Sequence, residues 1–294
     1  MMSEELCVFG EVLFDVFPGG HRVLGGAPFN VAWHLQAFSL APFFISRVGN
    51  DPEGIQIRKD MLDWGMNTLA LQTDDRLSTG RVSIELHDGE PEYDIVEPAA
   101  YDAIEELPGC EPVCQFLYHG SLAIRNDISR RALEQLKSCQ PTTVFVDVNL
   151  RKPWWDKHVV TELLQGADWV KLNNDEFNLL YASNDTGKNT LSSFIDEYGL
   201  RGVILTHGKA GAEVMTANAE HHNIKPDIAV EVVDSVGAGD AFTAVTIMGL
   251  NNNWSLKTTI QRAQNFASAI VGQRGATVKD QGFYQDFLNA WDNN

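Results

Sequence analysis

The stretch Asp234-Ser235-Val236-Gly237-Ala238-Gly239-Asp240, which continues as AFTAVTIMGL up to Leu250, is the most informative part of the chain. Its second half is apolar, with small residues at helical spacing, and therefore predicts a buried helix. Two glycines precede that helix and allow backbone geometry that a side chain would forbid. Successive amides can then converge on an anion at the helix N-terminus. The stretch predicts a phosphate-binding loop that leads into a buried helix.

Asp240 falls in the first turn of this predicted helix. A carboxylate there can accept the proton of a hydroxyl group that attacks a phosphoryl group bound by the loop. The same carboxylate can also be only a helix cap that the helix dipole favours. We favour the catalytic interpretation, because other segments of the chain, described below, also resemble parts of a phosphoryl-transfer site.

Outside this stretch, short and nearly continuous apolar runs alternate with segments of helical period. Such runs are typical of strands buried on both faces of a sheet. The expected strands are 6–12, 43–48, 115–118, 143–148, 168–172 and 202–206, and the expected helices include 30–38, 52–64, 128–138, 191–198, 256–271 and 283–291. This alternation predicts an α/β fold with a mostly parallel sheet and right-handed crossovers.

Two segments break the alternation. Residues 79–94 read as an alternating strand, an Asp-Gly turn and a second strand, which is a hairpin signature, and 14–24 with its Pro-Gly-Gly is a second candidate. They are either surface hairpins or a small lid over a site, and we favour the lid. We therefore expect a single domain over 1–294, with lid segments at about 12–24 and 79–100.

The formal charge of −18 argues against a nucleic-acid partner and against anionic membrane surfaces. No apolar run reaches the length of about 18 residues that a membrane span needs. The N-terminal residues are acidic before the first apolar run, which is the opposite of a signal peptide. We expect a cytoplasmic protein without nucleic-acid or membrane partners.

The chain contains four cysteines, Cys7, Cys110, Cys114 and Cys139. Cys110 and Cys114 have no histidine at a zinc-like spacing, and the other two lie in or beside apolar stretches. The sequence therefore predicts four reduced thiols rather than disulfides or a metal site.

The DSVGAGDAFTA stretch resembles the second signature of the ribokinase, or phosphofructokinase-B type, carbohydrate kinase family. GGAPFNVA at 25–32 resembles the first signature, and the two occur in the family's order. The resemblance covers nearly the whole chain and is closest to bacterial fructokinases. It implies a ribokinase-like three-layer α/β fold with a mostly parallel central sheet and a small β-hairpin lid. It also implies an anion cradle made by Gly237, Ala238 and Gly239, and Asp240 as the catalytic base.

Residues for the sugar follow from the same comparison. Gly25 and Gly26 allow a close approach of the backbone to a ligand, and Asn30 would project from the following helix with two donors and one acceptor. Asp15 matches the family's sugar-binding aspartate after the first strand. Arg151, in a segment that resembles the D-x-N-x-R stretch of fructokinases, can hold substrate oxygens with its guanidinium group, although a surface ion pair is the alternative.

Residues for ATP are also implied by resemblance. Asn173 and Glu176 match the family's N-x-x-E element, where Glu176 would position Mg²⁺ through water; a helix cap is the alternative. The nucleotide-binding residues that the resemblance implies are Asn173, Glu176, Thr206, Gly208, Gly211, Asn265 and Ser268. Asp234, with the loop 273–276, fits the family's site for a monovalent cation such as K⁺.

The sequence therefore predicts an ATP-dependent sugar kinase that uses Mg²⁺ and whose acceptor is fructose, giving fructose 6-phosphate. A 2-keto-3-deoxygluconate kinase or a ribokinase is the alternative within the class, and a catalytically silent sugar-binding regulator is the alternative outside it. A dinucleotide-dependent oxidoreductase is disfavoured, because no G-x-G-x-x-G follows an early strand. The resemblance also implies a homodimer in which lids pack together.

Overall fold

The computed structural model describes residues 5–87, 90–108, 114–181, 190–227 and 230–292. Its central sheet has nine strands in the order β13-β12-β11-β10-β9-β8-β1-β4-β5. All neighbours are parallel except at one edge, where β12 is antiparallel to both β11 and β13. The strands are β1 (Glu5–Phe9), β4 (Phe43–Gly49), β5 (Leu71–Asp74), β8 (Cys114–His119), β9 (Thr143–Asp147), β10 (Trp169–Asn173), β11 (Gly202–Thr206), β12 (Ala212–Thr216) and β13 (His221–Ile224).

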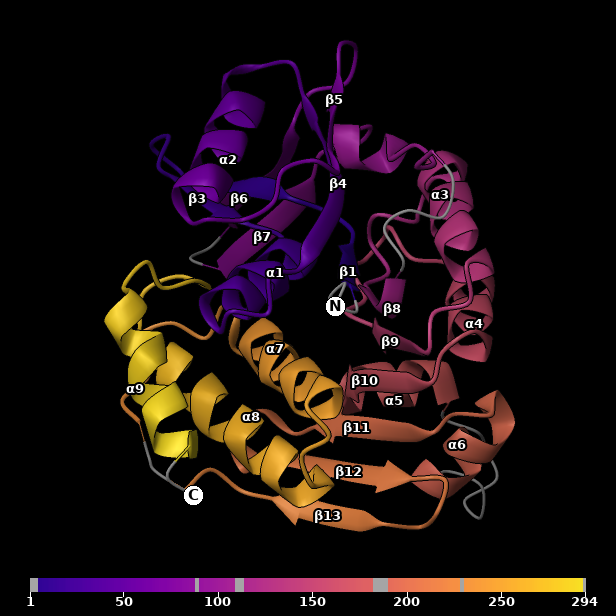
Figure 1. The fold of residues 1–294 in the computed structure, drawn as a ribbon. Helices are drawn as coiled ribbons and strands as arrows, with labels where there is room; N and C mark the ends of the chain where they lie inside the picture. The colour runs from indigo at the N-terminus through magenta and orange to yellow at the C-terminus, as the bar shows by residue number, and fades with distance from the viewer. Residues whose placement is uncertain (1–4, 88–89, 109–113, 182–189, 228–229, 293–294) are drawn as a thin grey trace.

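Helices cover both faces of this sheet (Figure 1). One face packs against α1 (Ala27–Ala37), α2 (Pro52–Asp63), α7 (Ala238–Asn251) and α8 (Leu256–Val271), with α9 (Gln281–Asp292) outside them. The other face packs against α3 (Asp127–Ser138), α4 (Lys157–Gln165), α5 (Asn174–Tyr181) and α6 (Leu191–Tyr198). Two short 3₁₀ turns, η1 (Ala100–Ala103) and η2 (Gly208–Ala210), complete the helical elements of the described residues.

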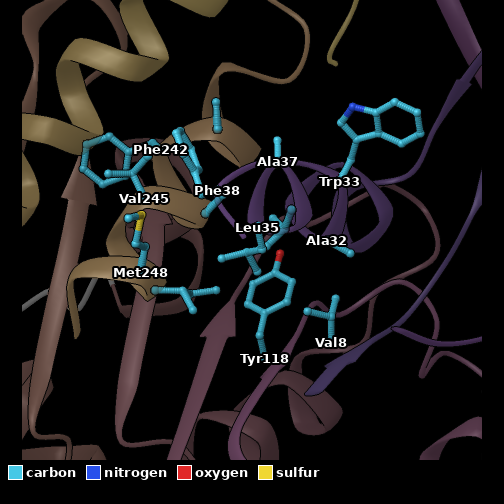
Figure 2. Packing of buried hydrophobic residues seen from close by; sticks show 14 of the residues in the cluster. Val8, Ala32, Trp33, Leu35, Ala37, Phe38, Tyr118, Phe242, Val245 and Met248 are labelled. Atoms are coloured by element: carbon cyan, nitrogen blue, oxygen red, sulfur yellow. The ribbon is translucent and has the colours of Figure 1, made fainter. Parts of the chain in front are cut away.

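The period of two along each strand explains why both faces are apolar. Successive side chains of a strand point to opposite faces. Val8 belongs to the core beside α1 and α7, whereas its neighbours Cys7 and Phe9 belong to the core beside α3. Figure 2 shows the first of these cores, in which Val8 and Tyr118 of the sheet lie close to α1. The nearly continuous apolar runs of the sequence are therefore strands with two buried faces.

A second, four-stranded sheet has the order β3-β2-β6-β7. Its strands are β2 (Leu13–Val16), β3 (Arg22–Gly25), β6 (Gly80–His87) and β7 (Glu90–Ile95). The two hairpins are antiparallel, and β2 and β6 join them in parallel. Both expected hairpins are present and form one sheet, which lies beside α1 and α2 (Figure 1).

The expected fold class is confirmed, and each expected strand and helix is present with ends shifted by a few residues. The sequence prediction did not include β5, α4, α5 or the antiparallel strands β12 and β13. Within the described residues no helix is both long and apolar enough to span a bilayer.

The prediction of four reduced thiols is wrong. Cys7 of β1 and Cys114 of β8 form a disulfide, and Cys139 is also disulfide-bonded. Cys7 and Cys114 are 107 residues apart in the chain. The pairing depends on β1 and β8 being neighbours in the sheet, and cysteine spacing does not contain that information.

Candidate active site

Asp240 lies where the two glycine-containing segments of the chain meet. The Nδ2 group of Asn30, in the first turn of α1, donates a hydrogen bond of 2.8 Å to Oδ2 of Asp240, in the first turn of α7. Gly237 begins α7 with φ 78°, and a Cβ there would lie 2.4 Å from Cα of Ala276. Only glycine fits this position, so the loop before Asp240 is fixed by backbone packing.

The environment of Asp240 suits a general base. The pKa of its carboxyl group is raised from 3.8 to about 6, chiefly by burial and also by the charge of Asp147. The hydrogen bond from Asn30 and the charges of Lys171 and Arg151 lower this pKa and partly offset the effect. A carboxylate with such a pKa is ionised at neutral pH but is a stronger base than an exposed aspartate.

The other predicted sugar-binding residues belong to the turn that leads into α1, to β2 and to the segment after β9. Oδ2 of Asp15, on β2, lies 3.3 Å from the position of a Cβ on Gly25. Gly26 begins α1 with φ 106°, and a Cβ there would lie 2.7 Å from the carbonyl oxygen of Glu11. Burial raises the pKa of Asp15 to about 6, whereas the charge of Arg151 lowers it. The exposed Arg151 thus lies near enough to influence both Asp15 and Asp240.

Glu11 is a site residue that the sequence analysis missed. It follows β1 directly, only 2% of it is exposed, and its Oε2 has no hydrogen-bond partner among the described residues. Burial raises the pKa of its carboxyl group to about 7, and the charges of Arg151 and Asp240 also influence it. The available signal was a carboxylate directly after a buried strand, because sheets of this kind bind ligands at the carboxyl ends of their strands.

The predicted phosphate-side residues lie on neighbouring strands. Asn173 at the end of β10 pairs in register with Thr206 at the end of β11. Glu176 accepts hydrogen bonds from the amides of Leu150 (2.8 Å) and Asn173 (2.9 Å). The Asn173 side chain accepts from the Glu176 amide at 2.9 Å. Asn173 therefore caps α5 and Glu176 completes the capping box, as in the alternative interpretation.

The donor set in this region suits a magnesium ion held largely by phosphates and water. No cluster of three or more His, Cys, Asp or Glu residues among the described residues could bind a metal directly. Each Glu176 oxygen receives one amide and keeps a lone pair for a water molecule. Mg²⁺ normally retains several waters and uses few carboxylates, so the residues present fit such an ion.

Beyond Thr206, Gly208 (φ 55°) and Gly211 (φ 107°) form the turn that leads into β12. A Cβ on Gly211 would lie 2.0 Å from the carbonyl oxygen of Ile224, so this turn packs tightly on β13. The predicted element is therefore a rigid turn at the carboxyl end of β11.

Asn265 and Ser268 line a cleft of about 690 Å³ between α8 and α9. Apolar atoms of Val230 and Ala269 line the same cleft. Asn265 donates a hydrogen bond of 2.9 Å to Asp227. The size and mixed lining of the cleft suit a purine ring.

Asp234 joins the loops that flank α7 and α8. One of its oxygens accepts from the amide of Val236 and the other from the amide of Gly275, both at 3.0 Å. The loop 273–276 is thus next to Asp234, as the resemblance implies.

Lys171 was also missed, and it forms a buried ion pair beneath the glycine loop. Its Nζ lies 2.7 Å from Oδ2 of Asp147. The hydroxyl of Thr243, one turn after Asp240, donates to the same carboxylate oxygen at 2.8 Å. Asp147 is the first residue of the segment that resembles D-x-N-x-R, and the structure connects it to α7.

Comparisons with known proteins show which family this chain resembles. The family model for the pfkB family carbohydrate kinases matches residues 5–281. Fructokinase of Escherichia coli is 30% identical over 297 residues, covering 94% of this chain and 95% of that protein. The crystal structure of fructokinase from Vibrio cholerae O395, in a form with fructose, ADP and calcium ion bound, superposes with a TM-score of 0.78 at 26% identity, over 97% of this chain and 99% of the other.

A fructokinase from Xylella fastidiosa with bound ATP has a TM-score of 0.84 at 18% identity, over 99% of this chain and all (100%) of that one, which supports the fold. The family match spans both glycine segments and every predicted site residue. The family model over most of the chain and the 30% identity to the E. coli enzyme establish that the chain belongs to the pfkB family of carbohydrate kinases.

Proposed function

We propose that the protein transfers the γ-phosphoryl group of Mg-ATP to fructose and produces fructose 6-phosphate. The observation that carries the proposal is the hydrogen bond between Asn30 and Asp240. It connects the turn assigned to the sugar with the loop assigned to the phosphate. A general base must lie within hydrogen-bond reach of the hydroxyl group that it activates, and this contact puts Asp240 beside the sugar turn.

In the proposed reaction, Asp240 accepts the proton of the attacking hydroxyl group. The hydroxyl oxygen forms a bond to the γ-phosphorus, and the bond to the β–γ bridging oxygen breaks, with its electron pair leaving on ADP. The amides of 237–239 hold the charge that develops on the phosphoryl oxygens. Asp15, Asn30 and Arg151 orient the sugar, and the second sheet excludes water that would otherwise hydrolyse ATP.

Glu176 would hold a magnesium ion through water, with Asn173 beside it, and the rigid turn at Thr206, Gly208 and Gly211 would bind the nucleotide phosphates. When bound, the ion neutralises charge on the nucleotide phosphates. The cleft lined by Asn265 and Ser268 would take the adenine ring. We also propose a monovalent cation at Asp234, because a double mutant of the V. cholerae enzyme was solved with potassium ion as well as fructose and ADP.

Fructose is the preferred acceptor because the named bacterial relatives are fructokinases and the V. cholerae structure contains fructose. One observation favours a second acceptor, 2-keto-3-deoxygluconate. Arg151 is exposed and its recorded hydrogen bond is to the carbonyl oxygen of Leu150, so its guanidinium can hold a carboxylate. Arg151→Met would then abolish binding of the sugar acid and would weaken the binding of fructose only modestly.

An ADP-release assay with fructose, 2-keto-3-deoxygluconate and ribose tests the proposal, with the product identified by NMR. We expect the highest kcat/KM with fructose and phosphorylation at the 6-hydroxyl. A higher kcat/KM with either other acceptor would reassign the substrate. Sugar binding without ADP release for any acceptor would instead support a silent regulator.

We further propose that the enzyme is a homodimer in which the four-stranded sheets of two copies pack together. A sheet with unpaired edges requires a cover, and a second copy can provide it. Size-exclusion chromatography with light scattering should give twice the monomer mass. A monomer mass at assay concentration would exclude the dimer.

A further inference from the structure

Lys171 occupies an unusual place for a lysine, in the interior below the glycine loop. Its side chain is 8% exposed, and that of its partner Asp147 is 4% exposed. A buried ion pair adds little net stability, because removing both charges from water opposes their attraction. Well-packed apolar residues at these two positions would stabilise the fold at least as well. The pair therefore requires an explanation in addition to stability.

The ammonium group has hydrogen-bonding capacity to spare. It carries three N–H donors, and among the described residues Asp147 is the partner that accepts one of them. Asp147 also accepts from Thr243, so the carboxylate connects Lys171 to the first turns of α7. The ammonium is thereby held at a fixed distance from the loop that begins this helix.

The position of the ammonium relative to the loop indicates which ligand it can reach. Nζ lies 3.5 Å from the place of a Cβ on Gly239, so the absence of a side chain there leaves the ammonium close to the loop surface. The charge of Lys171 also lowers the pKa of both Asp240 and Glu176. Lys171 thus lies near the base and near the element assigned to the nucleotide phosphates.

We propose that Lys171 is a catalytic residue that donates its free N–H groups to oxygens of the γ-phosphoryl group during transfer. The inference rests on the proposed kinase function and adds a cation to the loop amides. Lys171 keeps its proton throughout, while Asp240 takes the proton of the hydroxyl group and ADP leaves with the electron pair of the broken bond. A preorganised positive charge in a water-poor site stabilises the charge that spreads over the phosphoryl oxygens.

The rival explanation is that the pair only holds α7 in place. Three variants separate the two explanations. Lys171→Met removes the ammonium and leaves Asp147 unpaired, whereas the double variant Lys171→Met/Asp147→Asn removes both charges. Arg47→Met is the matched control, because Arg47 and Asp74 form another buried ion pair (2.9 Å) on β4 and β5, away from the site.

We expect kcat of Lys171→Met to fall by about 10²–10³-fold, with the KM for the sugar nearly unchanged. The double variant should regain stability against urea but not kcat, and Arg47→Met should lose stability but keep kcat. A double variant with kcat within about threefold of wild type would overturn the inference, because the charges would then be dispensable.

A binding measurement tests the same contact without turnover and without a sugar. By calorimetry, Lys171→Met should bind β,γ-imido-ATP about 10–100-fold more weakly than wild type, with the affinity for ADP unchanged. Equal losses for both nucleotides, or no loss, would contradict a contact to the γ-phosphoryl group. If the wild type releases no ADP with any sugar, the proposed function fails, while this comparison still decides the role of Lys171.

Discussion

At the scale of single residues, Asp240 is the group on which the proposed chemistry depends. We predict that Asp240→Asn folds normally and binds ATP, but loses about 10²–10⁴-fold in kcat, the usual effect of removing a general base. Steady-state assays and calorimetry test this. Asp286→Asn, which changes an exposed carboxylate on α9, is the control and should have wild-type kcat. A near-normal kcat in Asp240→Asn would show that Asp240 is not the general base.

The pH dependence follows from the environment of the same carboxylate. Asp240 must be ionised to accept a proton, and its pKa is raised to about 6, so kcat/KM should fall as the pH drops through about 6. The hydrogen bond from Asn30 lowers this pKa, so Asn30→Ala should shift the acid limb to higher pH. Glu11 and Asp15 also have raised pKa values and lie nearby. The fall of kcat/KM at low pH therefore reflects the titration of the three carboxyl groups together and not of Asp240 alone. An unmoved limb in Asn30→Ala would contradict the assignment.

Glu11 allows a prediction about stability. Its pKa is raised to about 7 in the folded protein, so folding favours the protonated form. The stability contributed by that form is fully present below about pH 4.5 and is lost as the pH rises through about 7. Glu11→Gln should therefore be more stable than wild type by about 2–3 kcal/mol at pH 8 and no more stable near pH 4. Urea denaturation at both pH values measures this, with the exposed Glu106→Gln as the control.

At the scale of elements, the beginning of α7 depends on a glycine for two reasons. Gly237 has φ 78°, and a Cβ there would lie 2.4 Å from both Cα and Cβ of Ala276. We predict that Gly237→Ala displaces the loop and lowers kcat at least as strongly as it lowers stability. Gly199→Ala is the matched control, because Gly199 also has a positive φ (67°) but open space around it. Equal kcat in the two variants would show that the close packing does not position the loop.

Helices and strands could be predicted from the sequence where a local pattern of apolar residues or glycines determines them. The apolar runs became central strands because both faces of the sheet are covered, and 237–240 became a helix start because its glycines allow the turn. The hydrogen bond between Asn30 and Asp240 joins the two stretches that carry the family resemblance, although the order of these stretches along the chain does not by itself predict a contact.

The sequence did not reveal the roles of Lys171 and Glu11, because these roles depend on which strands and turns are neighbours in the fold. Lys171 reaches Asp147 because β10 and β9 pair in register at these two residues. In the sequence, Lys171 is simply a polar residue inside a strand. Glu11 similarly gains its role from burial beneath the α1 turn, which no local pattern records. Contacts of this kind arise from tertiary packing and cannot be read from the spacing of residues along the sequence.

At the scale of the whole molecule, the site and the disulfide lie on different parts of the same strand. Gly10 and Glu11 follow the carboxyl end of β1, whereas Cys7 is in its middle and bonds to Cys114 at the first residue of β8. Disulfides are uncommon in the reducing cytoplasm and persist in oxidising compartments.

We predict that reduction lowers stability but leaves catalysis intact. The bond closes a loop of 107 residues, and loops of about 100 residues gain at most about 4–5 kcal/mol from such a bond. Without reductant, Cys7→Ala/Cys114→Ala should be less stable against urea than wild type by up to this amount. With dithiothreitol the difference between the two proteins should disappear, because every disulfide, including that of Cys139, is then reduced in both. The kcat should be the same in all these samples, because β1 and β8 stay paired through their backbone hydrogen bonds. If unreduced, denatured protein reacts with a thiol reagent at Cys7 and Cys114, the bond is absent, and the stability of β1 then rests on packing alone.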